Sequence, residues 1–207
     1  IGRDLVVRLA DMRSRGDRLG ARAAWESATA GRQDEIRERM DALVETAYAE
    51  MGRALRGGDA YVTFGNVDRP GRLAAHLPPG CRFVDAEVIE IEGLAVGFAG
   101  GGAPGLGIPG EVTEDEMRDK LSSLGDVDVL CTHVAPAVRM LSGDVIGGRP
   151  KHSGVVLEYL LQHRPRWHYF GDIHQPQAIR WRVGDTECRN VGYFRATRRA
   201  VRHPRVS

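Results

Sequence analysis

The chain has 207 residues, of which 42% are hydrophobic, enough to bury one sizeable core. Its 29 basic and 28 acidic residues leave a formal net charge of +1, which gives no broad attraction to nucleic acid or to a membrane surface. Cys81, Cys131 and Cys188 lie far apart, which disfavours a disulfide framework and a thiolate zinc cluster. We therefore expect a cytoplasmic protein without a membrane span, since no apolar run approaches the ~20 residues that a span requires.

The first part of the chain is predicted to be helical. Apolar residues recur at three- and four-residue steps from Ile36 to Leu55 and form one stripe, and Gly57 and Gly58 end the helix. We interpret residues 1–57 as a helical segment that precedes the sheet core or is inserted in it, and residues 58–207 as that core. Helices of this kind often bind partners, so oligomerisation through them is left open.

Beyond this segment, short strands alternate with helices. A helix is predicted from the capping box of Thr113 and Glu116 to about Leu124, and another begins at Ser153. The predicted strands and hairpins are "AYVTF", "AEVIEIEG" with "LAVGFAG", "VDVLCT", "WHYF", and "AIRWRV" with "TECRNV". This alternation predicts a layered α/β domain with a mixed sheet or sheets.

Residues that can bind a metal follow three of these predicted strands. Asn66 follows the first, His133 the second, and Asp172 with His174 the third. Ligand sites in α/β sheets gather beyond the carboxyl ends of the strands, so these side chains are expected to converge. Their oxygen and imidazole donors suit manganese, iron or zinc, and the lack of thiolates disfavours a closed structural zinc site.

Each of these residues also has a simpler interpretation when it is considered alone. Asn66 and Asp68 are typical turn formers, His133 can be a hydrogen-bonded histidine beside a proline, and Asp172 can cap a turn. Their joint placement at the ends of strands is what favours a functional site.

The motifs "GNVD", "THVAP" and "GDIHQP", in this order and each after a strand, resemble the calcineurin-like metallophosphoesterases over about residues 58 to 195. The resemblance implies a layered αββα sandwich with mixed β-sheets and two divalent metal ions, manganese, iron or zinc, at the sheet ends. By this resemblance Asn66, His133 and Asp172 hold one ion, His174 binds the other, and Asp68 supports these ligands. The implied activity is hydrolysis of a small phosphoester, a monoester or a diester, by a metal-activated water.

Several departures from the family pattern affect this prediction. The earlier Asp-x-His and Gly-Asp-x-x-Asp motifs of the family are not found, and "RGD" at residues 15–17 is interpreted as chance. Since the sequence begins at Ile1 rather than Met, we expect the chain to be N-terminally incomplete and, alone, to bind metal weakly and hydrolyse little. Val67 stands where the family commonly has a histidine that contacts the substrate, and Asp172 replaces the first histidine of Gly-His-x-His.

Other functions stay open at this stage. The missing motifs, Val67 and the N-terminal helices also fit a non-catalytic or single-metal domain that binds a protein partner. Nucleic-acid binding through the basic tail is disfavoured, because the neutral total charge gives no broad footprint. The loop from Gly100 to Gly110 can border a substrate cleft or be a plain surface loop. The charged residues Arg139, Lys151 and His152 are expected to be solvated and are left out of the site.

Overall fold

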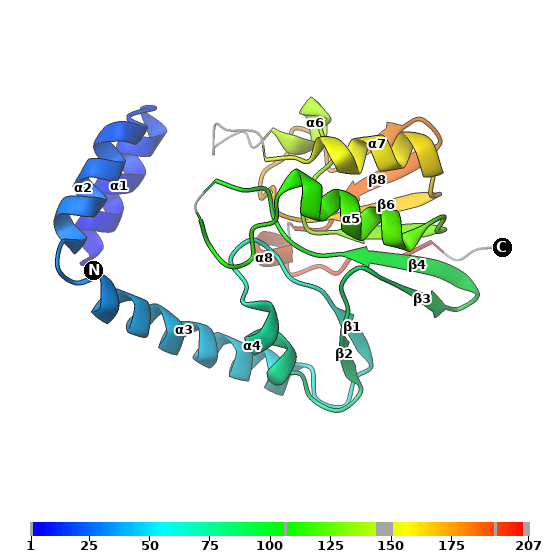
Figure 1. Cartoon of the computed structure of the whole chain (residues 1–207), viewed down its shortest axis with the longest axis horizontal. Helices are drawn as coiled ribbons and strands as arrows, with labels where there is room; N and C mark the ends of the chain where they lie inside the picture. The colour runs from blue at the N-terminus through cyan, green and yellow to red at the C-terminus, as the bar shows by residue number, and fades with distance from the viewer. Residues whose placement is uncertain (1, 106, 144–150, 193, 205–207) are drawn as a thin grey trace.

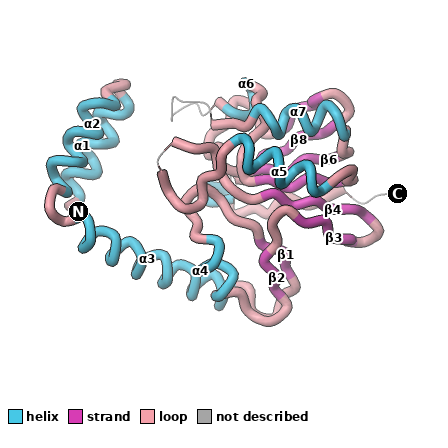
Figure 2. The backbone as a smooth tube through the Cα atoms, in the orientation of Figure 1, coloured by secondary structure: helices cyan, strands magenta, loops and turns pink. Residues whose placement is uncertain are grey.

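The computed structural model describes residues 2–105, 107–143, 151–192 and 194–204. An arm of helices projects from an α/β core that holds the strands of these described residues (Figures 1 and 2). The core contains a six-stranded mixed sheet and a two-stranded parallel sheet. The predicted α/β class with a mixed sheet and an N-terminal helical segment is therefore confirmed, and the second sheet is parallel rather than mixed.

The arm consists of three helices. α1 (Arg3–Ser14) and α2 (Arg18–Thr29) lie side by side as a hairpin, and α3 (Gln33–Ala54) connects this hairpin to the core (Figure 1). Asp17 caps α2 by accepting a hydrogen bond from the backbone N–H of Gly20 at 2.8 Å. The "RGD" sequence thus marks the turn between two helices.

The C-terminal half of α3 attaches the arm to the core. Tyr48 is buried in a cluster with Phe64 and Leu73, and Val44 and Met51 pack against the same cluster. The helix ends near Leu55, before the two glycines, as the sequence predicts.

The large sheet has the strand order β3-β4-β5-β6-β8-β7. Its middle strands β4, β5, β6 and β8 run parallel, and β3 and β7 are antiparallel edge strands that form the two predicted hairpins. The bounds are β3 Glu87–Ile91, β4 Leu94–Ala99, β5 Val129–Thr132, β6 Trp167–Phe170, β7 Arg180–Val183 and β8 Thr186–Asn190.

Two helices, α5 (Glu114–Leu124) and α7 (Gly154–His163), cover one face of this sheet (Figure 1). Their apolar residues and those of β5 and β6 form the main core cluster. The predicted capping box of Thr113 and Glu116 is formed in both directions, and Ser153 caps α7. The short helix α6 (Arg139–Ser142) lies between β5 and α7 in the chain, and the short helix α8 (Phe194–Thr197) follows β8.

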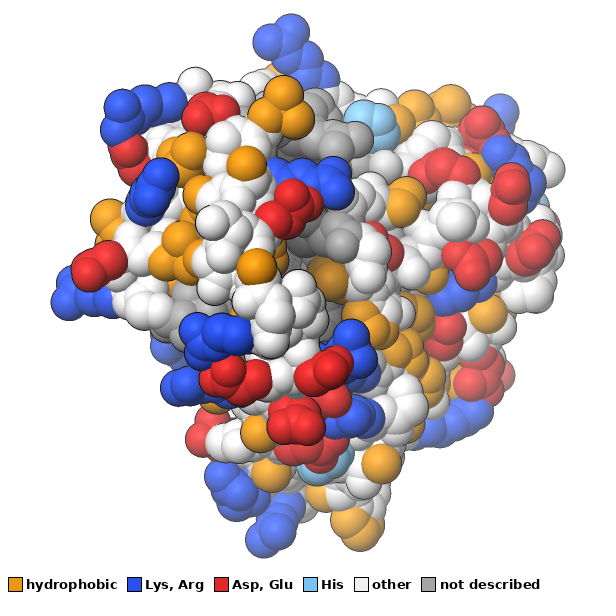
Figure 3. All heavy atoms as spheres, turned by 60° about the vertical axis from the view of Figure 1, so that its left-hand side comes forward, with side chains coloured by type: hydrophobic (Ala, Val, Ile, Leu, Met, Phe, Trp, Pro, Cys, Tyr) orange, Lys and Arg blue, Asp and Glu red, His pale blue; other side chains and the backbone are white. Residues whose placement is uncertain are grey.

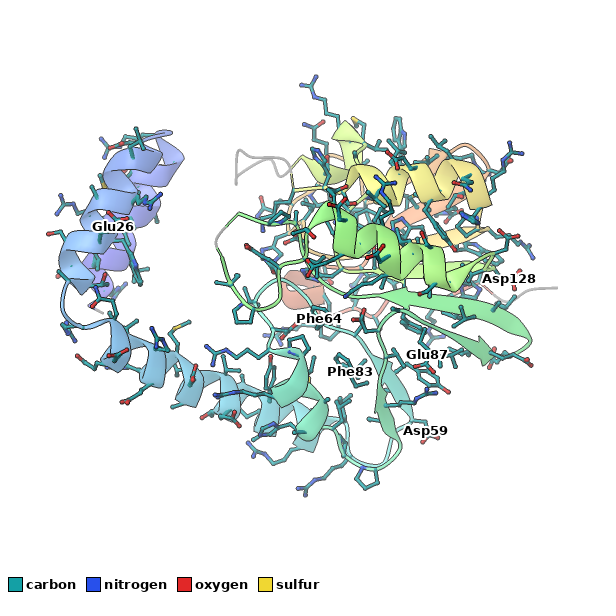
Figure 4. All side chains as sticks on the ribbon, viewed as in Figure 1. Glu26, Asp59, Phe64, Phe83, Glu87 and Asp128 are labelled. Carbon is teal, nitrogen blue, oxygen red and sulfur yellow. The ribbon has the colours of Figure 1, made fainter. Side chains whose placement is uncertain are left out.

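The second sheet consists of β1 (Ala60–Val62) and β2 (Cys81–Phe83), with α4 (Pro70–Ala75) between them in the chain. β1 ends at Val62, shortly before the predicted Phe64, and the ring of Phe64 stacks on that of Phe83, with ring centroids 6.1 Å apart (Figure 4). Neither β2 nor α4 was predicted. In the described part of the chain, no helix is long and apolar enough to cross a membrane.

Candidate functional site

The loops that follow β5 and β6 lie against each other. These strands are parallel neighbours, so their carboxyl ends emerge at the same edge of the sheet. The backbone N–H of Gly171 donates a hydrogen bond to the carbonyl oxygen of His133 at 3.0 Å. Nε2 of His133 lies 3.8 Å from Oδ1 of Asp172. The predicted proximity of these two side chains is thus observed.

Asp172 is held in an unusual backbone conformation. Its φ is 60°, and the N–H of Ile173 donates to the carbonyl oxygen of Gly171 at 2.7 Å, which forms a tight γ-turn centred on Asp172. The positive-φ γ-turn is the rarer and strained form, and such strain persists only where surrounding contacts maintain it. Asp172 is also buried. The strained turn therefore keeps a carboxylate inside the protein at the end of β6.

Asn190, at the end of β8, holds this turn in place by hydrogen bonds. Its Nδ2 donates to the carbonyl oxygen of Ile173 at 2.8 Å, and its Oδ1 accepts from the N–H of Gly192 at 2.7 Å. Asn190 is fully buried and lies on a strand adjacent to β6. This residue was not predicted, because a lone asparagine in a strand gives no signal of a contact with a distant loop.

The loop after β1 lies beneath the ring of His133. A Cβ atom at Gly65 would come within 2.5 Å of Cε1 of His133, so only glycine allows the ring to lie there. Asp68 fixes this loop, because its Oδ2 accepts from the N–H of Gly65 at 2.7 Å and its Oδ1 accepts from the hydroxyl of Tyr48 at 3.0 Å. Asp68 thus supports the loop of Asn66 with both carboxylate oxygens.

The glycine-rich segment packs against the same loop. A Cβ at Gly102 would lie 2.3 Å from Cβ of Asn66, and one at Gly110 would lie 2.0 Å from the carbonyl oxygen of Gly65. The N–H of Gly101 also donates to the carbonyl oxygen of Phe64 at 2.9 Å. The sequence left open whether this segment borders a substrate cleft or is a plain surface loop. At these glycines it packs against the loop of Asn66, which favours a segment that borders the site.

The other predicted ligands lie at the margin of this pair. Asn66 is half-buried and directly follows Gly65, whereas His174 is exposed, two residues beyond Asp172. Val67 is 66% exposed. Among the described residues, no group of three or more His, Cys, Asp or Glu side chains is placed to hold a metal ion. The structure thus brings two of the four predicted ligands into direct proximity.

Burial favours the neutral form of the His133 imidazole. Burial lowers the pKa of His133, and this effect outweighs the opposing attraction of Asp172 and Asp68; Lys151 and His174 lower the pKa further. A neutral imidazole has one ring nitrogen with a free electron pair, which is the form that binds metals. Within the described chain, Nε2 of His133 and Oδ2 of Asp172 are buried without a hydrogen-bond partner.

Lys151 contacts the buried carboxylate, although the sequence analysis left it out of the site. Its Nζ lies 2.9 Å from Oδ1 of Asp172, and the side chains of the lysine and the aspartate are 47% and 3% exposed. The expectation that Lys151 is simply solvated was wrong. The physical reason is that an anion buried this deeply needs a counter-charge, and this lysine reaches it from the protein surface.

These donors fit a divalent cation. Two ligands that are each ~2.1 Å from one ion lie roughly 3.0 to 4.2 Å apart, depending on the angle between the bonds. The 3.8 Å between His133 and Asp172 falls within this range. The unpartnered nitrogen and oxygen atoms are donors that manganese, iron and zinc accept. The carboxylate would have to release Lys151 to offer both of its oxygens.

Comparison with known proteins adds information on the fold. No protein-family model matches the chain, and no curated protein sequence matches it either. Six chains of solved structures match it. One has a TM-score of 0.55 and 17% sequence identity, and the match covers 78% of this chain and 67% of the other. The crystal structure of TT1561 of Thermus thermophilus has a TM-score of 0.49 and 20% identity over 72% of this chain and 70% of the other. The first of these matches indicates a shared fold, and an identity this low leaves function open.

Proposed function

We propose that this chain carries part of the metal centre of a metallophosphoesterase of the calcineurin-like class, which hydrolyses a small phosphoester. The observation that supports the proposal best is the pair of His133 and Asp172, a neutral imidazole and a strained, buried carboxylate that lie 3.8 Å apart. Among the described residues, Nε2 of His133 and Oδ2 of Asp172 have no hydrogen-bond partner. Backbone strain and buried polar atoms without a hydrogen-bond partner rarely occur together in a protein away from a functional site.

Asn66, His133 and Asp172 would hold one divalent ion and His174 would contribute to a second, with manganese, iron and zinc as candidates. Ions in such a centre polarise a phosphoryl group and lower the pKa of a bound water. The protein contributes an imidazole kept neutral by burial and a carboxylate oriented by its turn. Gly65 leaves the space that the ring of His133 requires.

Lys151 has a second role in this proposal. Because its side chain is about half exposed, it can leave Asp172 and turn towards an anionic substrate at the rim of the site. A lysine ammonium is a flexible point charge that suits phosphate. The substrate class is a phosphomonoester or phosphodiester, and the free cysteines fit a reducing, cytoplasmic setting.

Manganese binding to the purified chain, measured by titration with electron paramagnetic resonance of the free ion, tests the proposal. Asp172→Asn should weaken binding by more than about tenfold. The exposed pair of Asp126 and His163, 2.7 Å apart, provides a matched control, so Asp126→Asn should bind manganese like the natural chain. Equal affinity of all three proteins would refute the proposal.

Hydrolysis is measured separately with p-nitrophenyl phosphate and bis-p-nitrophenyl phosphate. The chain alone should hydrolyse little, because neither an Asp-x-His nor a Gly-Asp-x-x-Asp motif precedes Asn66 in it. A natural protein that contains these motifs together with this chain should show divalent-metal-dependent activity. Activity of either protein that persists in a chelator would contradict a metal-dependent reaction.

A non-catalytic or single-metal domain is the second candidate function. The ion pair of Lys151 and Asp172 favours it, because a protein cation already neutralises the buried carboxylate. If the domain binds no metal, manganese should not raise the melting temperature of the chain, whereas a bound metal stabilises the folded state by an amount that grows with the logarithm of its affinity.

A further inference from the structure

The helix α3 carries two apolar stripes rather than the single stripe that the sequence pattern indicates. Val44, Tyr48, Met51 and Leu55 follow one another at spacings of four, three and four residues, and this stripe faces the core. Ile36, Met40, Leu43 and Ala47 repeat the same spacing on a face that is rotated by roughly 80°. A second helix is the usual partner of a stripe with this 4-3-4 spacing.

The second stripe is open to solvent in the single chain. Met40 and Leu43 are 50% and 59% exposed. The hairpin of α1 and α2 likewise exposes Val6, Val7, Leu19 and Trp25. Figure 3 brings this side of the molecule forward and shows hydrophobic side chains interspersed with basic and acidic ones.

The total surface of the chain indicates that a face of interface size is uncovered. The accessible surface is 12801 Å² for a mass of 22.7 kDa. A compact monomer of this mass exposes about 9,500 Å². The excess of about 3,300 Å² is several times the ~800 Å² that one partner contributes to a standard interface. Much of the arm lies away from the core, as the position of Glu26 relative to Phe64 in Figure 4 shows.

The charges of the arm are complementary to each other. The hairpin, residues 3–29, has six arginines and four carboxylates, a net charge of +2. The helix α3, Gln33–Ala54, has six carboxylates and three arginines, a net charge of −3, and two of the carboxylates, Asp41 and Glu45, already pair with Arg69 and Arg72 of the same chain. In the described residues the hairpin helices pack mainly on each other. A second copy of the chain would therefore present a basic hairpin to an acidic α3.

We propose that two copies of this chain form a two-fold symmetric dimer in which the hairpin of each copy covers the exposed α3 stripe of the other. A two-fold axis makes the same contact twice, so both stripes and both hairpins are covered at once. The apolar residues supply the buried area, and the opposite charges favour pairing of the hairpin with α3 over pairing of two α3 helices. This dimer does not depend on a metal ion or on the proposed hydrolysis.

The test is sedimentation velocity of the complete chain at about 1 to 50 µM, where a micromolar interface assembles. The molar mass obtained for the natural chain should be twice the 22.7 kDa of one chain. Leu43→Glu on the α3 stripe and Val7→Glu on the hairpin should each give a monomer. Leu161→Glu, at an α7 position that is 54% exposed, is the matched control and should stay dimeric.

Each outcome decides the proposal. A monomeric natural chain at the highest concentration overturns it, and this is the result expected if the hairpin folds back on its own α3. If the Leu43→Glu variant remains dimeric, the interface lies elsewhere. If Val7→Glu remains dimeric but Leu43→Glu does not, two α3 helices pair with each other. Either result overturns the proposal. Far-UV circular dichroism and melting of the variants exclude unfolding as the cause, because Leu43 and Val7 are exposed in the single chain.

Discussion

Replacing Lys151 by methionine should increase the manganese affinity of this chain. In the structure the ammonium of Lys151 contacts Oδ1 of Asp172, so a metal that uses this oxygen must first displace the lysine. Methionine keeps most of the length and apolar surface of the side chain but removes the charge. The variant therefore isolates the competition between the ammonium and the metal.

The size of the effect follows from the geometry of the ion pair. A hydrogen bond to a charged group contributes about 1.5 to 3 kcal/mol. The 2.9 Å contact and the 3% exposure of the Asp172 side chain favour the upper part of this range, but the lysine is 47% exposed and therefore screened by water. We expect about 1.5 to 2 kcal/mol, which corresponds to an increase in affinity of roughly 10- to 30-fold.

The assay is a manganese titration at pH 7.5 and low ionic strength, followed by electron paramagnetic resonance. Lys151→Arg is the matched control, because it retains a cation that can pair with Asp172, and its affinity should stay within about threefold of the natural chain. Equal affinity of Lys151→Met and the natural chain would refute the reasoning, because the lysine would then not compete for this oxygen.

Four further predictions concern the core and the site. Burial lowers the pKa of His168 to about 3. The free energy of unfolding is therefore not reduced by this residue above pH ~6.5, but it falls by about 3 kcal/mol at pH 4.5, where only the unfolded state takes up the proton. In urea unfolding at these two pH values, His168→Gln should lose less stability at the lower pH than the natural chain does, and an equal loss would contradict this. Gly65→Ala should weaken manganese binding by more than about tenfold, because the added methyl group displaces the ring of His133; unchanged titrations would exclude this contact. Asp172→His should favour zinc over manganese, and an unaltered preference would show that residue 172 is not a ligand. In a protein that has the complete motifs, Val67→His should flatten the dependence of rate on leaving-group pKa, since a general acid contributes ~10²- to 10⁴-fold; parallel plots for both proteins would place residue 67 away from the leaving group.

The sequence predicts those parts of the fold that local rules determine. The capping box of Thr113 and Glu116 and the hairpin of "AIRWRV" with "TECRNV" each depend on neighbouring residues, and both are present. The three-residue strands β1 and β2 are too short to show a period, so β2 was missed and β1 ends at Val62, shortly before the predicted Phe64. Periodicity also does not reveal which helix face meets the core, and the two stripes of α3 were therefore interpreted as one.

The candidate site divides in the same way. His133 and Asp172 could be paired from the sequence, because both follow strands of a predicted α/β sheet and such strand ends share an edge. Lys151 and Asn190 could not, because a lysine in a loop and an asparagine in a strand usually face water or a local turn. Their contacts with the Asp172 turn depend on the packing of β6 against β8 and on the course of a distant loop.

The arm and the candidate site are connected through one chain of hydrogen bonds. The hydroxyl of Tyr48 on α3 donates to Asp68, and Asp68 accepts from the N–H of Gly65, on which the ring of His133 lies. Burial raises the pKa of Tyr48 to about 12, so the phenol keeps its proton at neutral pH and the connection persists. The end of α3 that bears Tyr48 is fixed to the core, whereas its other end carries the exposed stripe. A dimer formed through the arm would therefore restrain the same helix that positions the loop beneath His133.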